Sequence, residues 1–383
     1  MNTRCLYITG ISAIRLMRAA RAGEIVTATP AEITHVEALD PSIASLGDLQ
    51  IDALLDWLNI SEDNPLEVLA PSISQRHWFK TCVPRVLSND VPCGTFLELH
   101  SGSNADKALS WPTNLHIFIG GPALLLCYMS HYLSKRVIHG KMTKHVMKLR
   151  LIEFACECCG SYARDPFEPR TGECYYDLPN HDGRLTNLSI LTKDIRGLKG
   201  IKGFTKAASI MPYVLDFSGS PAETYVDLAL LLPPRLGGYG MVTPLINEQL
   251  VTDDAVRSRL RHKRIRPDVQ WPDYHMLAEY LGDKAHAGKS RRVEDKNRML
   301  DYAEAHYTPF TLMYDDVCNT GILRRTAEML ARAFTERGKK GELLRVQRLN
   351  RNEKFLARQQ TLMMTLLPPI TRYEQQSENT EKQ

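Results

Sequence analysis

The chain has 383 residues, of which 43% are hydrophobic, and a formal net charge of +4. A chain of this length and composition is expected to form two compact domains with ordinary hydrophobic cores. A net charge so close to zero excludes a protein that binds nucleic acid through its overall charge, so local basic clusters would have to do so.

The sequence also predicts a cytoplasmic protein with no membrane partner. The most apolar window, residues 115–129, is interrupted by Gly120, Gly121 and Pro122, so it is too short to cross a bilayer. Residues 1–9 lack the pattern of a secretory signal. Nine cysteines without a regular spacing fit a reducing compartment better than a disulfide framework.

The first elements in chain order are mainly helical. Residues 12–22 predict a basic helix that carries Arg15, Arg18 and Arg21. Either a solvated face or a contact with phosphate would account for these arginines. A buried strand is expected at residues 115–119.

A cysteine-rich helix is expected within residues 149–162, which contain Cys156, Cys158 and Cys159. A structural zinc site usually pairs two cysteine knuckles, and only Cys174 lies nearby downstream. Small buried core residues are therefore the favoured interpretation. A protein–protein module built on this helix, with bound zinc, is the alternative.

Residues 165–187 read as a loop or linker because they are rich in Pro, Gly, Asn and Asp. Lysines separated by glycines follow, an arrangement that lets the backbone approach phosphates closely. We expect DNA contact, rather than only a solvated face, from Lys199, Lys202 and Lys206.

A helix start is predicted at Ser220-Pro221-Ala222-Glu223. Serine suits the N-cap, proline the first turn, and glutamate three residues after the cap can close a capping box. This role explains Glu223 without catalysis, and a role beside a metal ion is the open alternative.

Residues 264–282 predict a β-hairpin, with a turn at residues 272–275. The hairpin brings Asp268 and Glu279 together from adjacent strands. Neighbouring buried carboxylates repel each other and lose hydration, and a divalent cation relieves both effects. The alternative is a surface acid beside the turn and a satisfied core acid.

The elements that follow are a helix at residues 290–307, a strand near 310–314 and a helix at 322–335. The order from residue 220 is thus helix, three strands, helix, strand and helix. A helix with many basic residues is expected after residue 337, and it could reach along DNA or bind a partner. The polar end of the chain, residues 374–383, is expected to be disordered.

Several of these points resemble the Vsr-like branch of the PD-(D/E)XK nuclease superfamily. They are Pro267-Asp268, the apolar run into Glu279, then Gly282, His286 and a helix with D-x-x-R at Asp295 and Arg298. The Ser-Pro-x-Glu helix start is similar to the upstream element of that pattern. One departure is Leu281, which stands where family members carry an acid or a lysine.

The resemblance implies an α/β (α+β) chain with a restriction-endonuclease-like core, in which helices flank a mixed central sheet. We assign residues 1–207 to a mixed, mainly helical companion or targeting domain, residues 208–336 to the nuclease core, 337–373 to the basic extension and 374–383 to the tail. Some nuclease-like proteins carry a helix ending in E-x-C-G-x-Y before the catalytic domain, and Glu157, Cys159-Gly160 and Tyr162 resemble it.

The activity implied by the resemblance is metal-dependent hydrolysis of DNA, in genome defence or repair. Asp268 and Glu279 would hold Mg²⁺ or Mn²⁺, and Glu223 would support them. His286 would position water or steady the leaving oxygen, and Arg298 would orient Asp268 or Glu279. In place of Leu281, the sequence offers Lys284, His286 or Lys289.

DNA would pass the metal along a basic segment, residues 257–266. The candidate DNA contacts in this segment are Arg261, Lys263 and Arg264, and Lys284 after the hairpin is a further candidate. Leu281 leaves a second hypothesis open, in which the fold has lost its chemistry. The protein would then be a DNA-binding regulator or an antitoxin-like component with a protein partner in a defence system.

Overall fold

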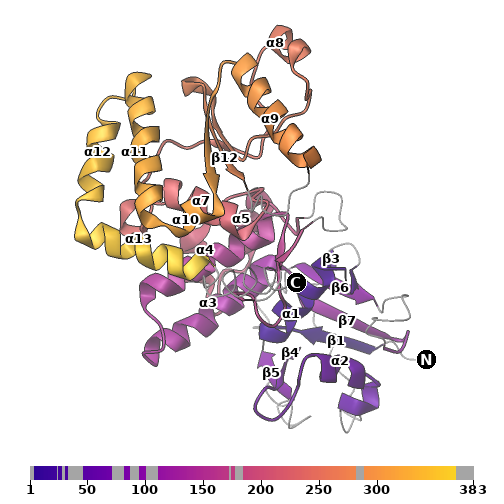
Figure 1. Cartoon of the computed structure of the whole chain (residues 1–383). Coiled ribbons are helices and arrows are strands. Elements are labelled where there is room, and N and C mark those ends of the chain that lie inside the picture. Colours follow the sequence, from indigo (N-terminus) through magenta and orange to yellow (C-terminus); the bar gives the residue numbers. More distant parts are fainter. Residues whose placement is uncertain are drawn as a thin grey trace, which may run out of the picture. The chain divides into compact units, whose positions relative to one another are not determined.

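The computed structural model describes residues 4–23, 25–27, 31–32, 46–70, 82–86, 95–100, 111–171, 174–176, 184–281 and 289–367. The chain divides into two compact units, Met1–Val214 (unit 1) and Leu215–Gln383 (unit 2). Both units combine helices with sheets (Figure 1), so the chain is a mixed α and β protein. The boundary lies close to the one expected at residue 207. Within the described residues, no helix is long and apolar enough to cross a membrane.

Unit 1 contains a seven-stranded mixed sheet around β1 (Arg4–Ile8). This strand pairs in parallel with β7 (Leu115–Gly120) and antiparallel with β4 (Leu66–Ala70). The strand order is β2-β6-β7-β1-β4-β5, and β3 also pairs with β6. The remaining strands are β2 (Val26–Thr27), β3 (Ala31–Glu32), β5 (Cys82–Val86) and β6 (Thr95–His100).

Unit 1 was expected to be mixed and mainly helical, and its large sheet is the part that the sequence did not predict. Only β7 was predicted, from its continuous apolar run, which is typical of a strand buried on both faces. The short partner strands gave no clear periodic signal, because two to six residues hold too few alternations.

Unit 1 also contains helices, some between the strands of its sheet in the sequence and some after them (Figure 1). They are α1 (Gly10–Arg21), α2 (Asp52–Trp57), α3 (Pro122–Ile138), α4 (Lys144–Cys159), α5 (Leu188–Gly197) and α6 (Phe204–Ile210). The other described elements of unit 1 are two 3₁₀ turns, η1 (Leu46–Leu49) and η3 (Met211–Tyr213), and the small hairpin of β8 (Ala163–Arg164) and β9 (Cys174–Tyr175).

The cysteines of α4 are core residues, as their helical spacing predicted. Cys156, Cys158 and Cys159 are all buried. Burial raises the pKa of the Cys158 thiol to about 12, so this thiol stays neutral at ordinary pH.

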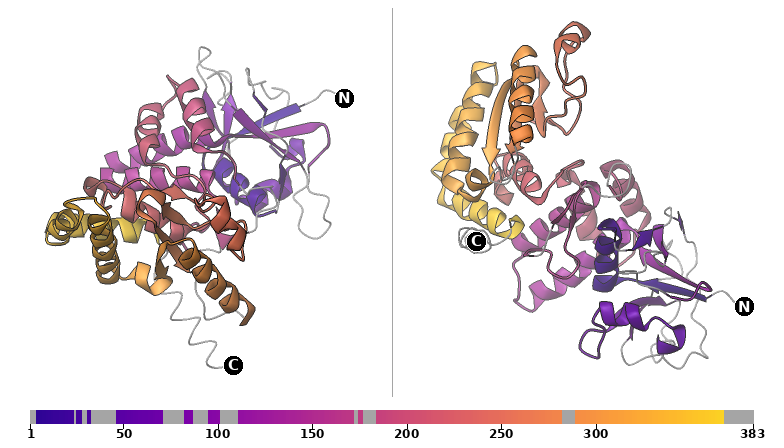
Figure 2. Two further views of the ribbon diagram at one scale, coloured as in Figure 1. Left: turned by 90° about the horizontal axis from the view of Figure 1, so that it is seen from above. Right: turned by 45° about the vertical axis from the view of Figure 1, so that its right-hand side comes forward.

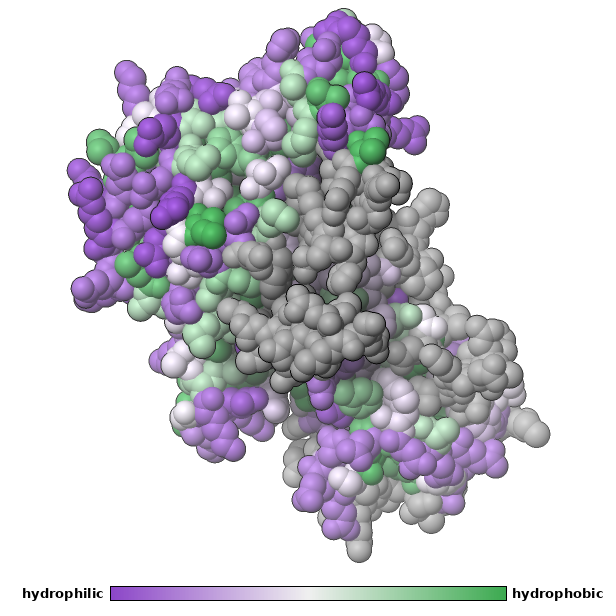
Figure 3. All heavy atoms as spheres, viewed as in Figure 1, coloured by the Kyte–Doolittle hydropathy of each residue, from purple (hydrophilic) through white to green (hydrophobic). Residues whose placement is uncertain are grey.

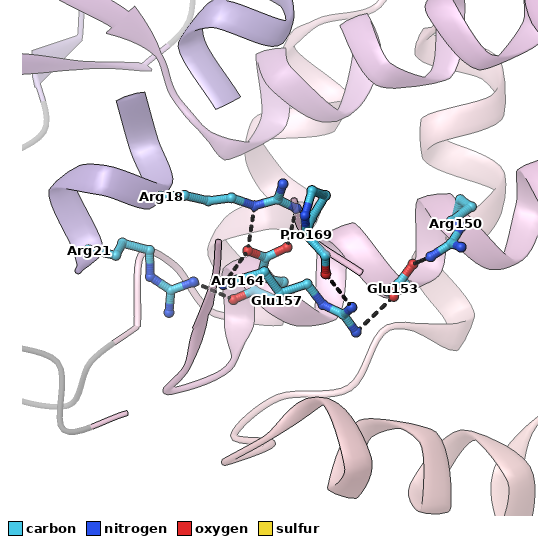
Figure 4. A network of polar contacts seen from close by, with 7 residues as sticks. All are labelled: Arg18, Arg21, Arg150, Glu153, Glu157, Arg164 and Pro169. Atoms are coloured by element: carbon cyan, nitrogen blue, oxygen red, sulfur yellow. Dashed lines mark hydrogen bonds and ion pairs between the residues drawn. The ribbon is translucent and has the colours of Figure 1, made fainter. Parts of the chain in front are cut away.

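Two arginines of α1 are buried and paired within the protein, so the solvated face considered for the basic helix is wrong for them. Arg18 and Arg21 are 7% and 2% exposed. Arg18 donates to both carboxylate oxygens of Glu157 on α4, at 2.8 and 2.7 Å. Arg21 donates to the backbone oxygen of Glu157, as Figure 4 shows, and to that of Gly160. The motif E-x-C-G-x-Y thus ties α1 to the end of α4.

Unit 2 is built on a four-stranded sheet of order β10-β11-β12-β13. The strands are β10 (Leu245–Ile246), β11 (Val269–Trp271), β12 (Met276–Leu281) and β13 (Thr308–Met313). The predicted hairpin is confirmed, because β11 and β12 pair antiparallel around a 3₁₀ turn, η5 (Pro272–Tyr274). His275 closes this turn in the left-handed region, at φ 47°. β13 joins β12 in parallel.

The predicted element order of unit 2 is also confirmed, with two short helices added. The helices are α7 (Pro221–Leu231), α8 (Asp254–Arg259), α9 (Lys289–Glu304), α10 (Tyr314–Cys318) and α11 (Thr320–Glu336). A 3₁₀ turn, η4 (Pro234–Leu236), follows α7. Helices α9 and α11 lie on opposite sides of the sheet (Figures 1 and 2).

The basic extension after residue 337 is part of unit 2 rather than a free arm. It forms α12 (Glu342–Asn350) and α13 (Glu353–Leu366), separated by Asn352, whose side chain caps α13. Helix α12 packs on α11, and α13 packs on α7 (Figure 2). Val346, Phe355 and Leu362 are buried there, so the charged residues of these helices cover an apolar stripe.

We predict that Phe334→Ala destabilises unit 2 by about 3–5 kcal/mol, since its fully buried ring leaves a cavity. The ring packs edge-on against Trp271, with centroids 5.3 Å apart. Chemical denaturation followed by tryptophan fluorescence measures the loss, because Trp271 is the one tryptophan of this unit. Met329→Ala on the same helix, where the side chain is 58% exposed, is the control and should change little.

Candidate functional site

The site begins with the predicted helix start of α7. The Ser220 hydroxyl accepts a hydrogen bond from the Glu223 N–H at 3.0 Å, as an N-cap does. The Glu223 carboxylate accepts from the N–H of Gly219 at 2.7 Å, rather than from the N–H of the cap residue. Glu223 is therefore fixed by capping while its carboxylate also interacts with the acid on β12, Glu279.

The structure brings Asp268 and Glu279 together across the hairpin. Asp268 directly precedes β11, and its Oδ2 accepts the Tyr280 N–H of β12 at 2.6 Å. Burial raises the pKa of Asp268 well above its usual range, and the negative charges of Glu223 and Glu279 raise it further. The three carboxylates thus repel one another inside the protein.

Glu279 is held by two donors from α9. Its side chain is only 1% exposed, and its Oε1 accepts from Arg298 Nη2 at 2.7 Å and from the hydroxyl of Tyr302. Burial raises the pKa of Glu279, and the charge of Arg298 with these hydrogen bonds offsets only part of that effect. Arg298 therefore orients Glu279, which is the contact expected of it.

A fourth acid, Asp227, was not expected from the sequence. It lies one helical turn after Glu223 on α7, is 2% exposed, and its Oδ2 has no hydrogen-bond partner among the described residues. Burial raises the pKa of Asp227 well above its usual range, and the charge of Glu223 adds to the effect. The signal available in the sequence was a lone acid in an apolar helix body, four residues after Glu223.

These four acids line one small cavity, which we call the acid cavity. Its volume is about 10 Å³, close to what one water molecule needs. The other lining residues are Val226, Val269, Ala278, Tyr280 and Leu312. Carboxylate oxygens are the ligands that Mg²⁺ and Mn²⁺ prefer.

The acid cavity is not a finished metal site. Within the described residues, no group of three or more His, Cys, Asp or Glu side chains is spaced so that it could hold a metal ion. Protein donors occupy the carboxylates instead: the N–H groups of Gly219 and Tyr280, and the side chains of Arg298 and Tyr302. To bind there, a cation would have to contact the carboxylate oxygens that accept no hydrogen bond from these donors. It would also have to displace any proton bound to the four acids.

Other predicted site residues fall outside this geometry. Lys284 and His286 lie in 282–288, outside the described residues. Leu281 is the last residue of β12 and pairs with Met313 of β13. Lys289, the third candidate for the role of the missing acid or lysine, begins α9, and its side chain is outside the described part of the chain. Among the described cations, Arg298 contacts Glu279 of the acid cavity.

The predicted DNA-binding residues divide between the units. Arg261, Lys263 and Arg264 follow α8 in unit 2 and are exposed, and the surface over α8 and α9 is mainly hydrophilic (Figure 3). Arg261 donates to Asn297 at 2.5 Å, whereas Arg264 makes no ion pair with any described residue. The exposed residues Lys199, Lys202 and Lys206 belong to unit 1 instead.

Comparisons with known proteins return nothing for this chain: no protein-family model, no curated protein and no solved structure matches it.

The raised pKa values predict that unit 2 loses stability as the pH rises from about 4, the usual carboxyl pKa, through the raised values. An acid with a raised pKa in the folded state binds its proton more tightly there than in the unfolded chain, so stability falls across that window. Asp227→Asn should make the decline shallower, as thermal unfolding between pH 5 and pH 8 would measure.

Asp254→Asn is the matched control, because the Asp254 side chain is 100% exposed. An identical pH dependence in wild type, Asp227→Asn and Asp254→Asn would contradict the buried, proton-holding character of Asp227.

Proposed function

We propose that unit 2 is a metal-dependent DNA endonuclease of the PD-(D/E)XK type with a restriction-endonuclease-like core. The observation that carries the proposal is the acid cavity, in which Asp268 and Glu279 from paired strands meet Glu223 from the preceding helix. Acids gathered in this way destabilise the folded protein unless protons or a cation neutralise them, because each loses hydration and repels the others.

The order of elements supports the proposal. A helix precedes three antiparallel strands, and a second helix leads to a fourth strand that joins in parallel. This order agrees with the element order predicted from the sequence patterns. Acids lie where the resemblance expects them: on the helix start, before the second strand and within the third strand.

Each acid has a defined part in the proposed chemistry. Asp268 and Glu279 would hold Mg²⁺ or Mn²⁺ through the oxygens that the protein donors leave open, and Glu223 would support them. A metal ion bound there supplies an acidified water and neutralises charge on the phosphate. Arg298 fixes the rotamer of Glu279 and balances its charge. Exposed arginines at 261 and 264 would contact the DNA backbone.

The test is cleavage of plasmid DNA with Mg²⁺ by purified protein. We expect wild type to nick or linearise the plasmid, and Asp268→Asn to remove cleavage because the site loses one metal-binding carboxylate. Asp254→Asn should cleave like wild type, since this exposed acid lies outside the acid cavity. Equal cleavage by wild type and Asp268→Asn would contradict the proposal.

Arg298→Lys tests the positioning of Glu279. A lysine keeps the charge, but its shorter side chain does not place a nitrogen where Arg298 Nη2 contacts Glu279 and Tyr302 together. We expect cleavage to fall about 10–100-fold, the usual effect of losing a residue that orients a metal ligand, with a matching rise in the Mg²⁺ concentration needed for half-maximal rate. An unchanged Mg²⁺ dependence would show that Arg298 does not position a metal ligand.

Two observations favour a second candidate function. Leu281 stands where the resembled family carries an acid or a lysine, and protein donors already bind the carboxylates of the acid cavity. In this case the fold is inactive and serves as a DNA-binding regulator or an antitoxin-like component of a defence system in the cytoplasm. Its signature would be DNA binding that weakens steeply with salt, without cleavage and without any dependence on Mg²⁺.

A further inference from the structure

Unit 1 contains a cavity of ligand size that the proposed nuclease activity does not use. Its volume is about 560 Å³, within the range of roughly 300–1,000 Å³ that is usual for small-molecule sites. Helices α1, α3 and α4 and the segment 164–170 form its walls. We call it the arginine pocket, after its lining arginines: Arg15, Arg18, Arg136, Arg150, Arg164 and Arg170.

Two glutamates hold the inner arginines in fixed positions. Glu153 forms two ion pairs: its Oε2 lies 2.7 Å from Arg150 Nη1, and its Oε1 lies 2.8 Å from Arg164 Nη2. Both carboxylate oxygens of Glu157 accept hydrogen bonds from Arg18. Figure 4 shows these guanidinium groups gathered around the two acids, with Arg164 also bonded to the Pro169 carbonyl. The inner wall is therefore preorganised rather than flexible.

The lining carries more positive than negative charge. Six arginines and two glutamates line the pocket, and three of the arginines, Arg18, Arg150 and Arg164, are paired with these glutamates, so the lining keeps a net positive charge. Burial lowers the pKa of Arg170, the charges of Arg150 and Arg164 lower it further, and the charge of Glu153 offsets part of this effect. Arg136 is exposed at the rim and makes no ion pair within the described part of the chain. An anion in the pocket would relieve this repulsion.

The remaining lining residues indicate the kind of anion. Arg15 lies over the ring of Phe167, at 4.9 Å from its centroid, which gives the pocket a flat, cationic wall. Tyr132 and Phe154 add further aromatic surface. Planar guanidinium groups suit phosphate oxygens, and aromatic rings with arginine planes suit a nucleobase.

We propose that the arginine pocket binds a nucleotide, with its phosphates on the arginines and its base against the aromatic wall. The nucleotide is either a free mononucleotide or the 5′-phosphorylated terminal nucleotide of a strand, since both present the same chemistry. The proposal concerns unit 1 alone and does not rest on the nuclease activity of unit 2.

The experiment is calorimetric titration of the full chain in EDTA with four probes: inorganic phosphate, AMP, ATP and a short 5′-phosphorylated oligonucleotide. EDTA prevents metal-dependent hydrolysis during the titration. We expect AMP, ATP or the oligonucleotide to bind at least tenfold more tightly than phosphate. Tight mononucleotides identify a free nucleotide as the ligand, and a tight oligonucleotide with weak mononucleotides identifies the strand end.

Two variants locate the site. Arg136→Ala at the rim and Arg15→Gln at the aromatic wall should each weaken nucleotide binding at least tenfold. Arg196→Ala is the matched control, because this exposed arginine of α5 lies outside the pocket lining. Thermal unfolding without ligand shows whether each variant is folded.

Failure to bind any of the nucleotide probes would overturn the proposal, as would binding no tighter than phosphate. Equal nucleotide affinity in wild type, Arg136→Ala and Arg15→Gln would also overturn it, because the ligand would then lie elsewhere.

Discussion

The repulsion among buried carboxylates is the constraint on which unit 2 depends. Glu279 sits in the middle of β12 at 1% exposure, where an isolated negative charge would be strongly unfavourable. Arg298 and Tyr302 from α9 stabilise it, which ties that helix to the sheet. Burial also raises the pKa of Asp268, Glu223 and Asp227, and neighbouring carboxylates add to the effect: Glu279 acts on Asp268 and Glu223, and Glu223 acts on Asp227.

An acid cluster of this kind can be stabilised in two ways. Protons neutralise it when no cation is present, and a divalent cation could replace them when it binds. The small volume of the acid cavity allows one such guest. Unit 1 shows the opposite charge balance, because its arginine pocket holds more positive charge than its two glutamates neutralise. Each unit thus concentrates charge of one sign in a place where a ligand of the other sign would stabilise it.

The sequence predicted unit 2 far better than unit 1, for physical reasons. Capping residues at Ser220, the turn chemistry before His275 and the helical periods of α9 and α11 are local signals, so element order and the hairpin followed from them. The sheet of unit 1 was missed because its strands are short and pair with distant partners. Arg18 was misjudged since its partner Glu157 lies far along the chain. Asp227 escaped notice because burial, rather than spacing, makes it unusual.

Calorimetric titration of Mg²⁺ or Mn²⁺ into the protein measures whether the acids of the acid cavity share one cation. The account predicts binding of one ion per chain, with proton release that grows as the pH falls toward the raised pKa values. It also predicts that Asp268→Asn and Glu279→Gln lose this binding while Asp254→Asn keeps it. Absence of binding in wild type, or the same binding in all three variants, would contradict it.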